Sequence, residues 1–186
     1  LQIHFVTKCI CGWRPIVEAM NEAGADYFAD SRVENLANIQ DIGLSRMMVR
    51  IPMQSQAMDT VRYSDLSLNS DLSVIESLSD AALALERTHG VILMVEMGDL
   101  REGFMPDELI DAASRVLNLR GVWLAGIGAN FNCYGGIIPE EKQLKQLIEM
   151  AESIRRRFGI PLPIVSGGNT GSLYLLKEGR MPEGIT

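Results

Sequence analysis

The stretch Val91-Ile92-Leu93-Met94-Val95 is apolar at every position and is followed at once by Glu96. A short run that is apolar at both odd and even positions predicts a strand buried on both faces, as in a parallel sheet. Such a sheet needs helices on both faces to cover it. The stretch therefore predicts an α/β fold.

The same unit, a short strand followed by a longer amphipathic helix, repeats along the chain. Pro15 and Gly24 bracket the first helix, and Ser31-Arg32-Val33-Glu34 has the pattern of a capping box. The predicted strands are 3–8, 27–29, 47–51, 65–68, 91–96, 122–126 and 162–165. Repetition of this kind predicts a (β/α)8 barrel of the TIM type, with seven strands visible and the eighth truncated near 182–186. We expect one incomplete domain over 1–186.

Composition excludes several classes of protein. The 186 residues include 17 Lys and Arg against 24 Asp and Glu, and the net charge of −7 repels a phosphate backbone, so we expect no nucleic-acid partner. No apolar run approaches the ~20 residues of a membrane span. Three cysteines cannot all pair internally, which suggests a reducing, cytoplasmic location. Cys9 and Cys11 lack C-x-x-C spacing, so no metal is expected.

In a barrel, the loops at the carboxyl ends of the strands form the site. Lys8 ends the first predicted strand beside apolar neighbours. A desolvated lysine there would favour the neutral, nucleophilic amine. The alternative is a lysine whose side chain reaches solvent.

Two other segments at predicted strand ends could bind anions. The turn 166–170 has two glycines that would let the backbone approach a phosphate, although a plain turn with a capping residue explains it equally well. Arg101 follows the fifth strand in a loop bounded by glycines. It could face an anionic oxygen, or it could form a solvated salt bridge to Asp99 or Glu102.

Several motifs together resemble the pyridoxal-phosphate amino-acid racemases of the alanine-racemase-like barrel fold, nearest to the ornithine racemase and predicted amino-acid racemase group. The motifs are V-T-K at Lys8, A-D-S-R-V-E-N-L from Ala29, S-L-N-S from Ser67, V-I-L-M-V-E-M-G-D-L-R-E-G from Val91, N-C-Y-G-G from Asn132 and S-G-G-N-T from Ser166. They follow consecutive predicted strands and cover almost the whole chain.

The resemblance implies roles for these residues. In that family a first-strand lysine forms a Schiff base with pyridoxal 5′-phosphate, which implies Lys8, and an arginine after the fifth strand contacts the phenolic oxygen, which implies Arg101. The family's turn that binds the phosphate corresponds to Ser166, Gly167, Gly168, Asn169 and Thr170. The family's loop beside the cofactor ring corresponds to Asn130, Asn132, Cys133 and Tyr134.

The activity implied is racemisation of a free amino acid, alanine or an ornithine- or lysine-like one, through a carbanion at Cα. Lys8 would act as base on one face, and Cys133 or Tyr134 would be the acid on the other. A non-catalytic pyridoxal-phosphate binding or homeostasis protein and a barrel-fold amino-acid decarboxylase remain alternatives. The resemblance also implies a C-terminal β domain, absent from this chain, and a homodimer of the full-length protein.

Overall fold

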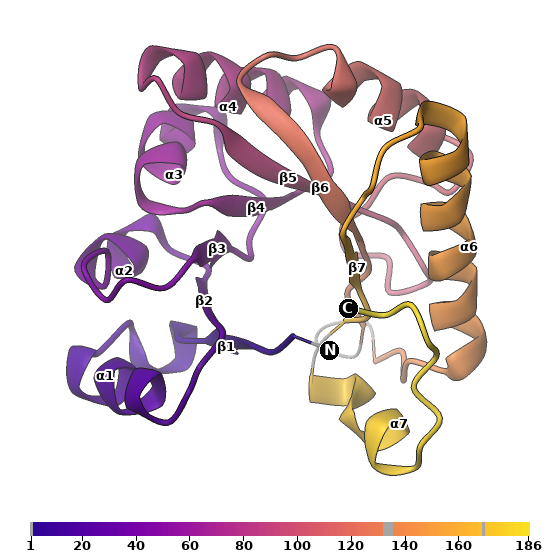
Figure 1. The fold of residues 1–186 in the computed structure, drawn as a ribbon, viewed down its shortest axis with the longest axis horizontal. Coiled ribbons are helices and arrows are strands. Elements are labelled where there is room, and N and C mark those ends of the chain that lie inside the picture. The colour runs from indigo at the N-terminus through magenta and orange to yellow at the C-terminus, as the bar shows by residue number, and fades with distance from the viewer. Residues whose placement is uncertain (1, 132–135, 169) are drawn as a thin grey trace. The chain divides into compact units, whose positions relative to one another are not determined.

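The computed structural model describes residues 2–131, 136–168 and 170–186, and within them seven strands follow one another in one sheet (Figure 1). The strands are β1 (His4–Val6), β2 (Tyr27–Asp30), β3 (Arg46–Met48), β4 (Leu66–Asn69), β5 (His89–Met94), β6 (Val122–Gly128) and β7 (Ile164–Ser166). Their order is β1-β2-β3-β4-β5-β6-β7. The pairs β1–β2, β2–β3, β3–β4 and β6–β7 are parallel, which confirms the sheet type that the sequence predicts.

Each strand is followed along the chain by an α-helix (Figure 1). The helices are α1 (Arg14–Glu22), α2 (Val33–Asn38), α3 (Ala57–Tyr63), α4 (Leu72–Ala84), α5 (Leu109–Leu117), α6 (Glu141–Phe158) and α7 (Leu173–Lys177). Short 3₁₀ helices lie at Lys8–Ile10, Gln54–Gln56 and Thr170–Ser172. Within the part of the chain described, no helix combines the length and the apolar composition that crossing a bilayer requires.

The chain divides into two compact units. The first unit is Leu1–Val91 with Leu119–Trp123, and the second unit is Ile92–Asn118 with Leu124–Thr186. Each unit has its own buried side chains and its own candidate residues, so each is described by itself.

In the first unit, α1 and α2 cover β2 and β3 with apolar side chains. Val17 of α1 packs with Phe28 of β2 and with Ile39, and all three are buried. Leu36 of α2 packs on Met48 of β3 in a second cluster. Burial of side chains of this size stabilises the fold by roughly 1.5–3 kcal/mol each. This packing holds α1 on β2 and α2 on β3.

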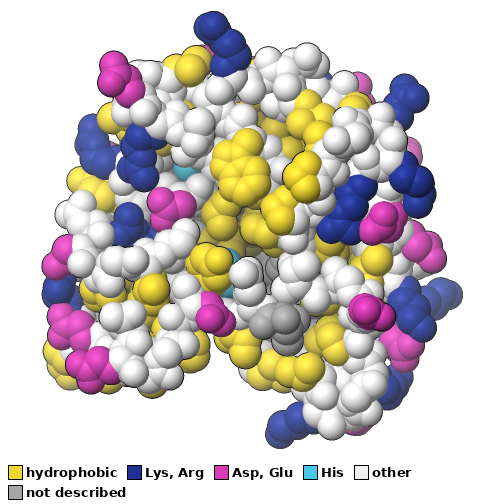
Figure 2. Space-filling model, in the orientation of Figure 1, with side chains coloured by type: hydrophobic (Ala, Val, Ile, Leu, Met, Phe, Trp, Pro, Cys, Tyr) yellow, Lys and Arg dark blue, Asp and Glu magenta, His cyan; other side chains and the backbone are white. Residues whose placement is uncertain are grey.

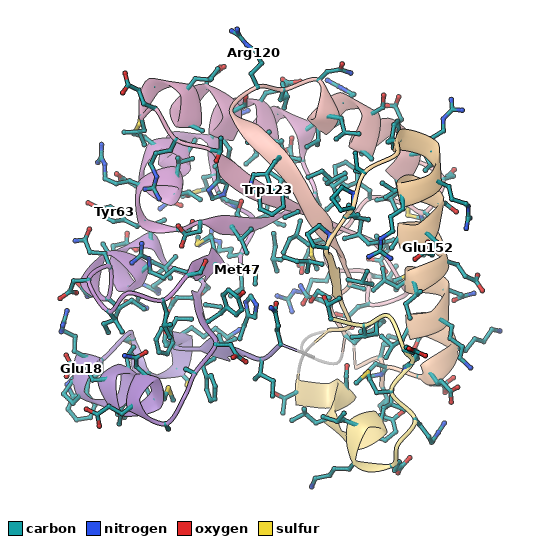
Figure 3. The ribbon with its side chains drawn as sticks, in the orientation of Figure 1. Glu18, Met47, Tyr63, Arg120, Trp123 and Glu152 are labelled. Atoms are coloured by element: carbon teal, nitrogen blue, oxygen red, sulfur yellow. The ribbon has the colours of Figure 1, made fainter. Side chains whose placement is uncertain are left out.

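Glycine leaves room for two larger side chains at one position of β5 in the first unit. A Cβ on Gly90 would lie 3.2 Å from the indole of Trp123, which is labelled in Figure 3, and would collide with Leu66. The missing side chain therefore gives these two larger residues room over the strand. Trp123 itself keeps 44% of its surface exposed.

In the second unit, α6 presents one apolar face. Its buried residues Leu144, Leu147, Ala151 and Ile154 recur at spacings of three and four, as an amphipathic helix requires. A capping box between Glu140 and Gln143 begins the helix.

The capping box predicted at Ser31–Glu34 is wrong. Helix α2 begins at Val33, and its N-terminal flanking residue Arg32 makes no side-chain cap. Asp30 takes the task instead, because its Oδ1 accepts hydrogen bonds from the Arg32 backbone N–H and from Asn35 Nδ2, each at 3.0 Å. The buried carboxylate at the end of β2 therefore replaces the serine hydroxyl that the sequence pattern predicts.

Candidate functional site

Lys8 stands one residue beyond a buried, doubly anchored threonine. The Thr7 backbone N–H donates to the Ala29 carbonyl at 2.8 Å, and Thr7 Oγ1 donates to Asp30 Oδ2 at 2.7 Å. Thr7 and Asp30 are both fully buried. A charge-assisted hydrogen bond inside the fold is among the stronger kinds. The backbone that carries Lys8 is therefore held firmly to β2.

A tight turn follows and directs the chain away from the strand. The Thr7 carbonyl accepts hydrogen bonds from the N–H groups of Ile10 at 3.1 Å and Gly12 at 3.2 Å. Gly12 has φ +61°, and a Cβ there would lie 3.1 Å from Asn35. The predicted first strand over 3–8 thus ends at Val6, because Thr7 turns the backbone and Lys8 begins the 3₁₀ helix.

The expected burial of Lys8 is not found. Its side chain is exposed, and its apolar neighbours Phe5 and Val6 are 38% and 40% exposed. Among the described residues, β1 has β2 as its one partner in the strand order. The Lys8 side chain is therefore exposed in the part of the chain that the structure describes, and its role at the cofactor stays a prediction.

The other lysines lie on helices. Lys142 and Lys145 are on α6, where Lys145 Nζ pairs with Glu141 at 2.5 Å, and Lys177 is the last residue of α7. Among the four lysines, Lys8 is the one beside the carboxyl end of a strand.

A buried polar chain in the first unit escaped the sequence analysis. Ser67 Oγ and His89 Nε2 are 2.8 Å apart, and Asn69 Nδ2 donates to Ser67 Oγ at 2.9 Å. Burial lowers the pKa of His89 to about 4, against the weaker opposing effect of the Ser64 backbone. Its ring is therefore neutral at physiological pH. Alternation within the S-L-N-S motif puts Ser67 and Asn69 on one face of β4, which is the signal that was available.

In the second unit, the loop after β5 winds around the carboxylate of Glu96. Glu96 Oε1 accepts hydrogen bonds from the N–H groups of Gly98 at 2.6 Å and Leu100 at 3.0 Å, and Oε2 accepts from Arg101 N–H at 3.3 Å. These bonds fix the course of the loop and the starting point of the Arg101 side chain.

Glu102 brings two predicted site residues together. Arg101 Nε lies 2.8 Å from Glu102 Oε2, and Asn130 Nδ2 donates to Glu102 Oε1. The salt bridge considered for Arg101 is therefore formed with Glu102, and it is only partly exposed, with 30% and 17% of the two side chains accessible. Glu102 is not among the predicted site residues, although it adjoins Arg101 in the sequence.

The turn after β7 lies against the loop after β6. Ala129 N–H donates to the Ser166 carbonyl at 3.2 Å, and Ser172 Oγ donates to the Gly167 carbonyl at 2.7 Å. Gly168 has φ +103°, and an added Cβ there would lie 2.9 Å from Phe131 Cδ2. A side chain at this position would be strained by the positive φ and would meet Phe131, so glycine suits this turn.

In the second unit, Arg101 and Asn130 share the contact with Glu102, and the turn from Ser166 packs beside the loop that carries Asn130. Thr170 is exposed in the 3₁₀ helix that follows this turn. The predicted residues Asn132, Cys133, Tyr134 and Asn169 lie outside the described residues.

Comparison with known proteins decides the family. The family model of the alanine racemase N-terminal domain matches residues 2–182. The chain belongs to this alanine racemase N-terminal domain family. Within the family, it is 42% identical to ornithine racemase of Acetoanaerobium sticklandii over 97% of this chain, and 34% identical to lysine racemase of Thermotoga maritima over 100%. It spans 52% of the length of each of these relatives.

Solved structures agree on the family fold. Alanine racemase of Clostridium difficile 630 superposes with a TM-score of 0.77 at 16% identity, covering 93% of this chain and 47% of the other. PipY of Synechococcus elongatus, solved with pyridoxal phosphate bound, gives a TM-score of 0.74 at 16% identity, covering 88% and 80%. The predicted fold class, the α/β barrel of the alanine racemase N-terminal domain with seven strands, is confirmed.

Proposed function

We propose that this chain is the cofactor-binding part of a pyridoxal-phosphate-dependent racemase of free amino acids, with ornithine- or lysine-like substrates. The observation that carries the proposal is Lys8, which begins the 3₁₀ helix directly after Thr7, the residue anchored by the buried Thr7–Asp30 hydrogen bond. Whole-chain identity to an ornithine racemase and a lysine racemase supports the reaction and the substrate class.

The residues present fit the cofactor. Lys8 offers an exposed amine, Arg101 offers a guanidinium, and the turn at Gly168 offers backbone that a Cβ would obstruct. When bound, pyridoxal phosphate supplies an electron sink that acidifies the proton on the substrate's Cα. Everything else in the reaction is the work of the protein's own groups.

Lys8 Nζ has two tasks in this proposal. It first holds the cofactor covalently, and after the substrate amine displaces it, it removes or returns the proton on one face of Cα. An amine on a firmly held backbone suits the second task, because proton transfer needs a fixed distance to Cα. Cys133 or Tyr134 is proposed to handle the proton on the opposite face.

Arg101 and the glycine turn are proposed to orient the cofactor. Arg101 donates to the phenolic oxygen, and Glu102 keeps the guanidinium in place through its contact with Nε. Backbone N–H groups of Ser166, Gly167, Gly168, Asn169 and Thr170 receive the phosphate, while Asn130 and Asn132 border the ring. Asn130 donates a hydrogen bond to Glu102, so Glu102 contacts both Asn130 beside the proposed cofactor ring and Arg101.

We also propose that the full-length protein is a cytoplasmic homodimer. Acidic and basic side chains are intermixed on the face shown in Figure 2, and no single-sign patch dominates it. This distribution supports a small-molecule partner over a nucleic acid.

A second candidate is a pyridoxal-phosphate binding protein without turnover. Likeness to PipY with its bound cofactor favours this candidate, because the match covers 80% of that chain. The two functions share the cofactor and Lys8, so only turnover separates them.

The test is incubation of the full-length protein and pyridoxal phosphate with enantiopure L-ornithine, L-lysine and L-alanine. Chiral chromatography should detect D-ornithine or D-lysine, with no release of CO₂. Cofactor binding without any D-amino acid would favour the non-catalytic protein, and CO₂ would indicate a decarboxylase.

A further inference from the structure

Asp99 is a buried carboxylate without a partner in the described part of the chain. Its accessibility is 5%, and neither Oδ1 nor Oδ2 accepts a hydrogen bond. It lies in the loop after β5, two residues before Arg101, so their backbones are at most about 7 Å apart. Asp99 therefore lies near Arg101, which is proposed to contact the cofactor.

The loop reverses the usual placement of polar and apolar residues. Leu100 is 85% exposed and has φ +52°, while the preceding aspartate is enclosed. Hydrogen bonds from Gly98 and Leu100 to Glu96 hold the loop in this course. Burying a carboxylate without hydrogen-bond donors lowers the stability of the folded protein, and exposing a leucine adds no stability. Conflicts of this kind concentrate at functional sites.

The described residues supply no donor to Asp99, and a cation is the strongest partner that a buried carboxylate can receive. Arg101 already pairs with Glu102. A divalent metal needs several oxygen or nitrogen ligands, and the described residues contain no group of three His, Cys, Asp or Glu side chains placed to hold one. A primary ammonium needs less, because its three N–H donors can be met by two carboxylate oxygens and one further acceptor.

We propose that Asp99 receives the side-chain ammonium of a diamino acid substrate and thereby sets the specificity of this protein. The inference rests on the proposed racemase function and names the group that selects its substrate. A site built to bind a charged group discriminates strongly against an analogue that lacks it, because the buried partner is then left unpaired. Norvaline, which lacks the δ-amino group of ornithine, is such an analogue.

The experiment measures binding and turnover separately. Isothermal titration of the full-length protein with L-ornithine and L-norvaline is repeated for Asp99→Asn, which keeps the shape and removes the charge. Asp107→Asn is the matched control, since Asp107 is an exposed aspartate of the same connection. Chiral chromatography then gives kcat/KM for both amino acids.

We expect Asp99→Asn to weaken ornithine binding and lower its kcat/KM by about 10- to 100-fold, the range for a lost hydrogen bond between charged groups. Norvaline values and the Asp107→Asn protein should stay within about twofold of the wild type. The melting temperature of ligand-free Asp99→Asn should hold or rise, because an unpaired buried charge is removed.

Three results would overturn the proposal. One is unchanged ornithine binding in Asp99→Asn, and another is an equal loss for ornithine and norvaline, which would assign Asp99 to the fold or to Arg101. The third is a wild type that binds both amino acids equally. If Asp99→Asn does not fold, Asp99→Ser is measured, and misfolding of both overturns the proposal. Selective ornithine binding without racemisation would refute the proposed function and leave the role of Asp99 intact.

Discussion

Replacing Gly168 with alanine tests the proposed phosphate turn. Gly168 has φ +103°, and the new Cβ would lie 2.9 Å from Phe131 Cδ2 and 3.1 Å from Ser172 Oγ. Phe131 is fully buried and cannot move aside at low cost. A side chain at such a φ costs about 1–3 kcal/mol, and overpacking adds about 1–3 kcal/mol.

A shift of the turn will relieve this strain. Because the backbone N–H groups of the turn then change position, they can no longer all donate hydrogen bonds to the phosphate. Because about 1.4 kcal/mol corresponds to a tenfold change in Kd, the lower end of the combined cost, about 2 kcal/mol, predicts at least about a 30-fold increase. Ser166→Ala removes one hydroxyl and leaves the backbone in place. We expect about a 10-fold increase for that variant.

The assay is absorbance titration of each purified variant with pyridoxal phosphate, together with thermal unfolding. Gly24→Ala is the control, because Gly24 has φ +90° and no atom within 4 Å of its added Cβ. It should lose about 1–3 kcal/mol of stability and keep its cofactor Kd. A Gly168→Ala protein with normal affinity, or a larger effect from Ser166→Ala, would refute the reasoning.

Three further predictions concern the polar groups Asp30, His89 and Glu102. Asp30→Ala removes the acceptor for Thr7 Oγ1 and Asn35 Nδ2 and should lower the free energy of unfolding by about 2–4 kcal/mol in urea titrations. Burial lowers the pKa of His89 from 6.5 to about 4, so the unfolded state is protonated first as the pH falls. The free energy of unfolding should therefore drop by about 3 kcal/mol between pH 6.5 and 4. This drop should vanish in His89→Gln. Glu102→Gln should weaken cofactor binding several-fold without changing the melting temperature by more than about 3 °C, since it loosens one partly exposed ion pair.

The fold could be predicted from the sequence to a large extent, because the spacing of apolar residues and the Pro and Gly residues at helix ends are local features of the sequence. The apolar run 91–95 identified β5, and Pro15 and Gly24 marked both ends of α1 within about two residues. The exact strand ends were harder to predict. Thr7 turns the chain before Lys8 because its side chain finds Asp30, which lies 23 residues away in the sequence.

The candidate site could be predicted only in part. Lysine, arginine and glycine residues at strand ends were visible as residue types, whereas their partners depend on tertiary contacts. Glu102 joins Arg101 to Asn130 across 28 residues of sequence. The reversed placement of Asp99 and Leu100 has no signature in the letters D-L, because burial is decided by the loop around Glu96.

The central claim is that Lys8 carries the cofactor, and reductive trapping tests it most directly. The full-length protein is incubated with pyridoxal phosphate, reduced with borohydride, digested and mapped by mass spectrometry. The predicted result is a pyridoxyl label on the peptide containing Lys8, and loss of the protein's visible absorbance band in Lys8→Ala. A label on Lys142, Lys145 or Lys177, or an unchanged band in Lys8→Ala, would contradict the account.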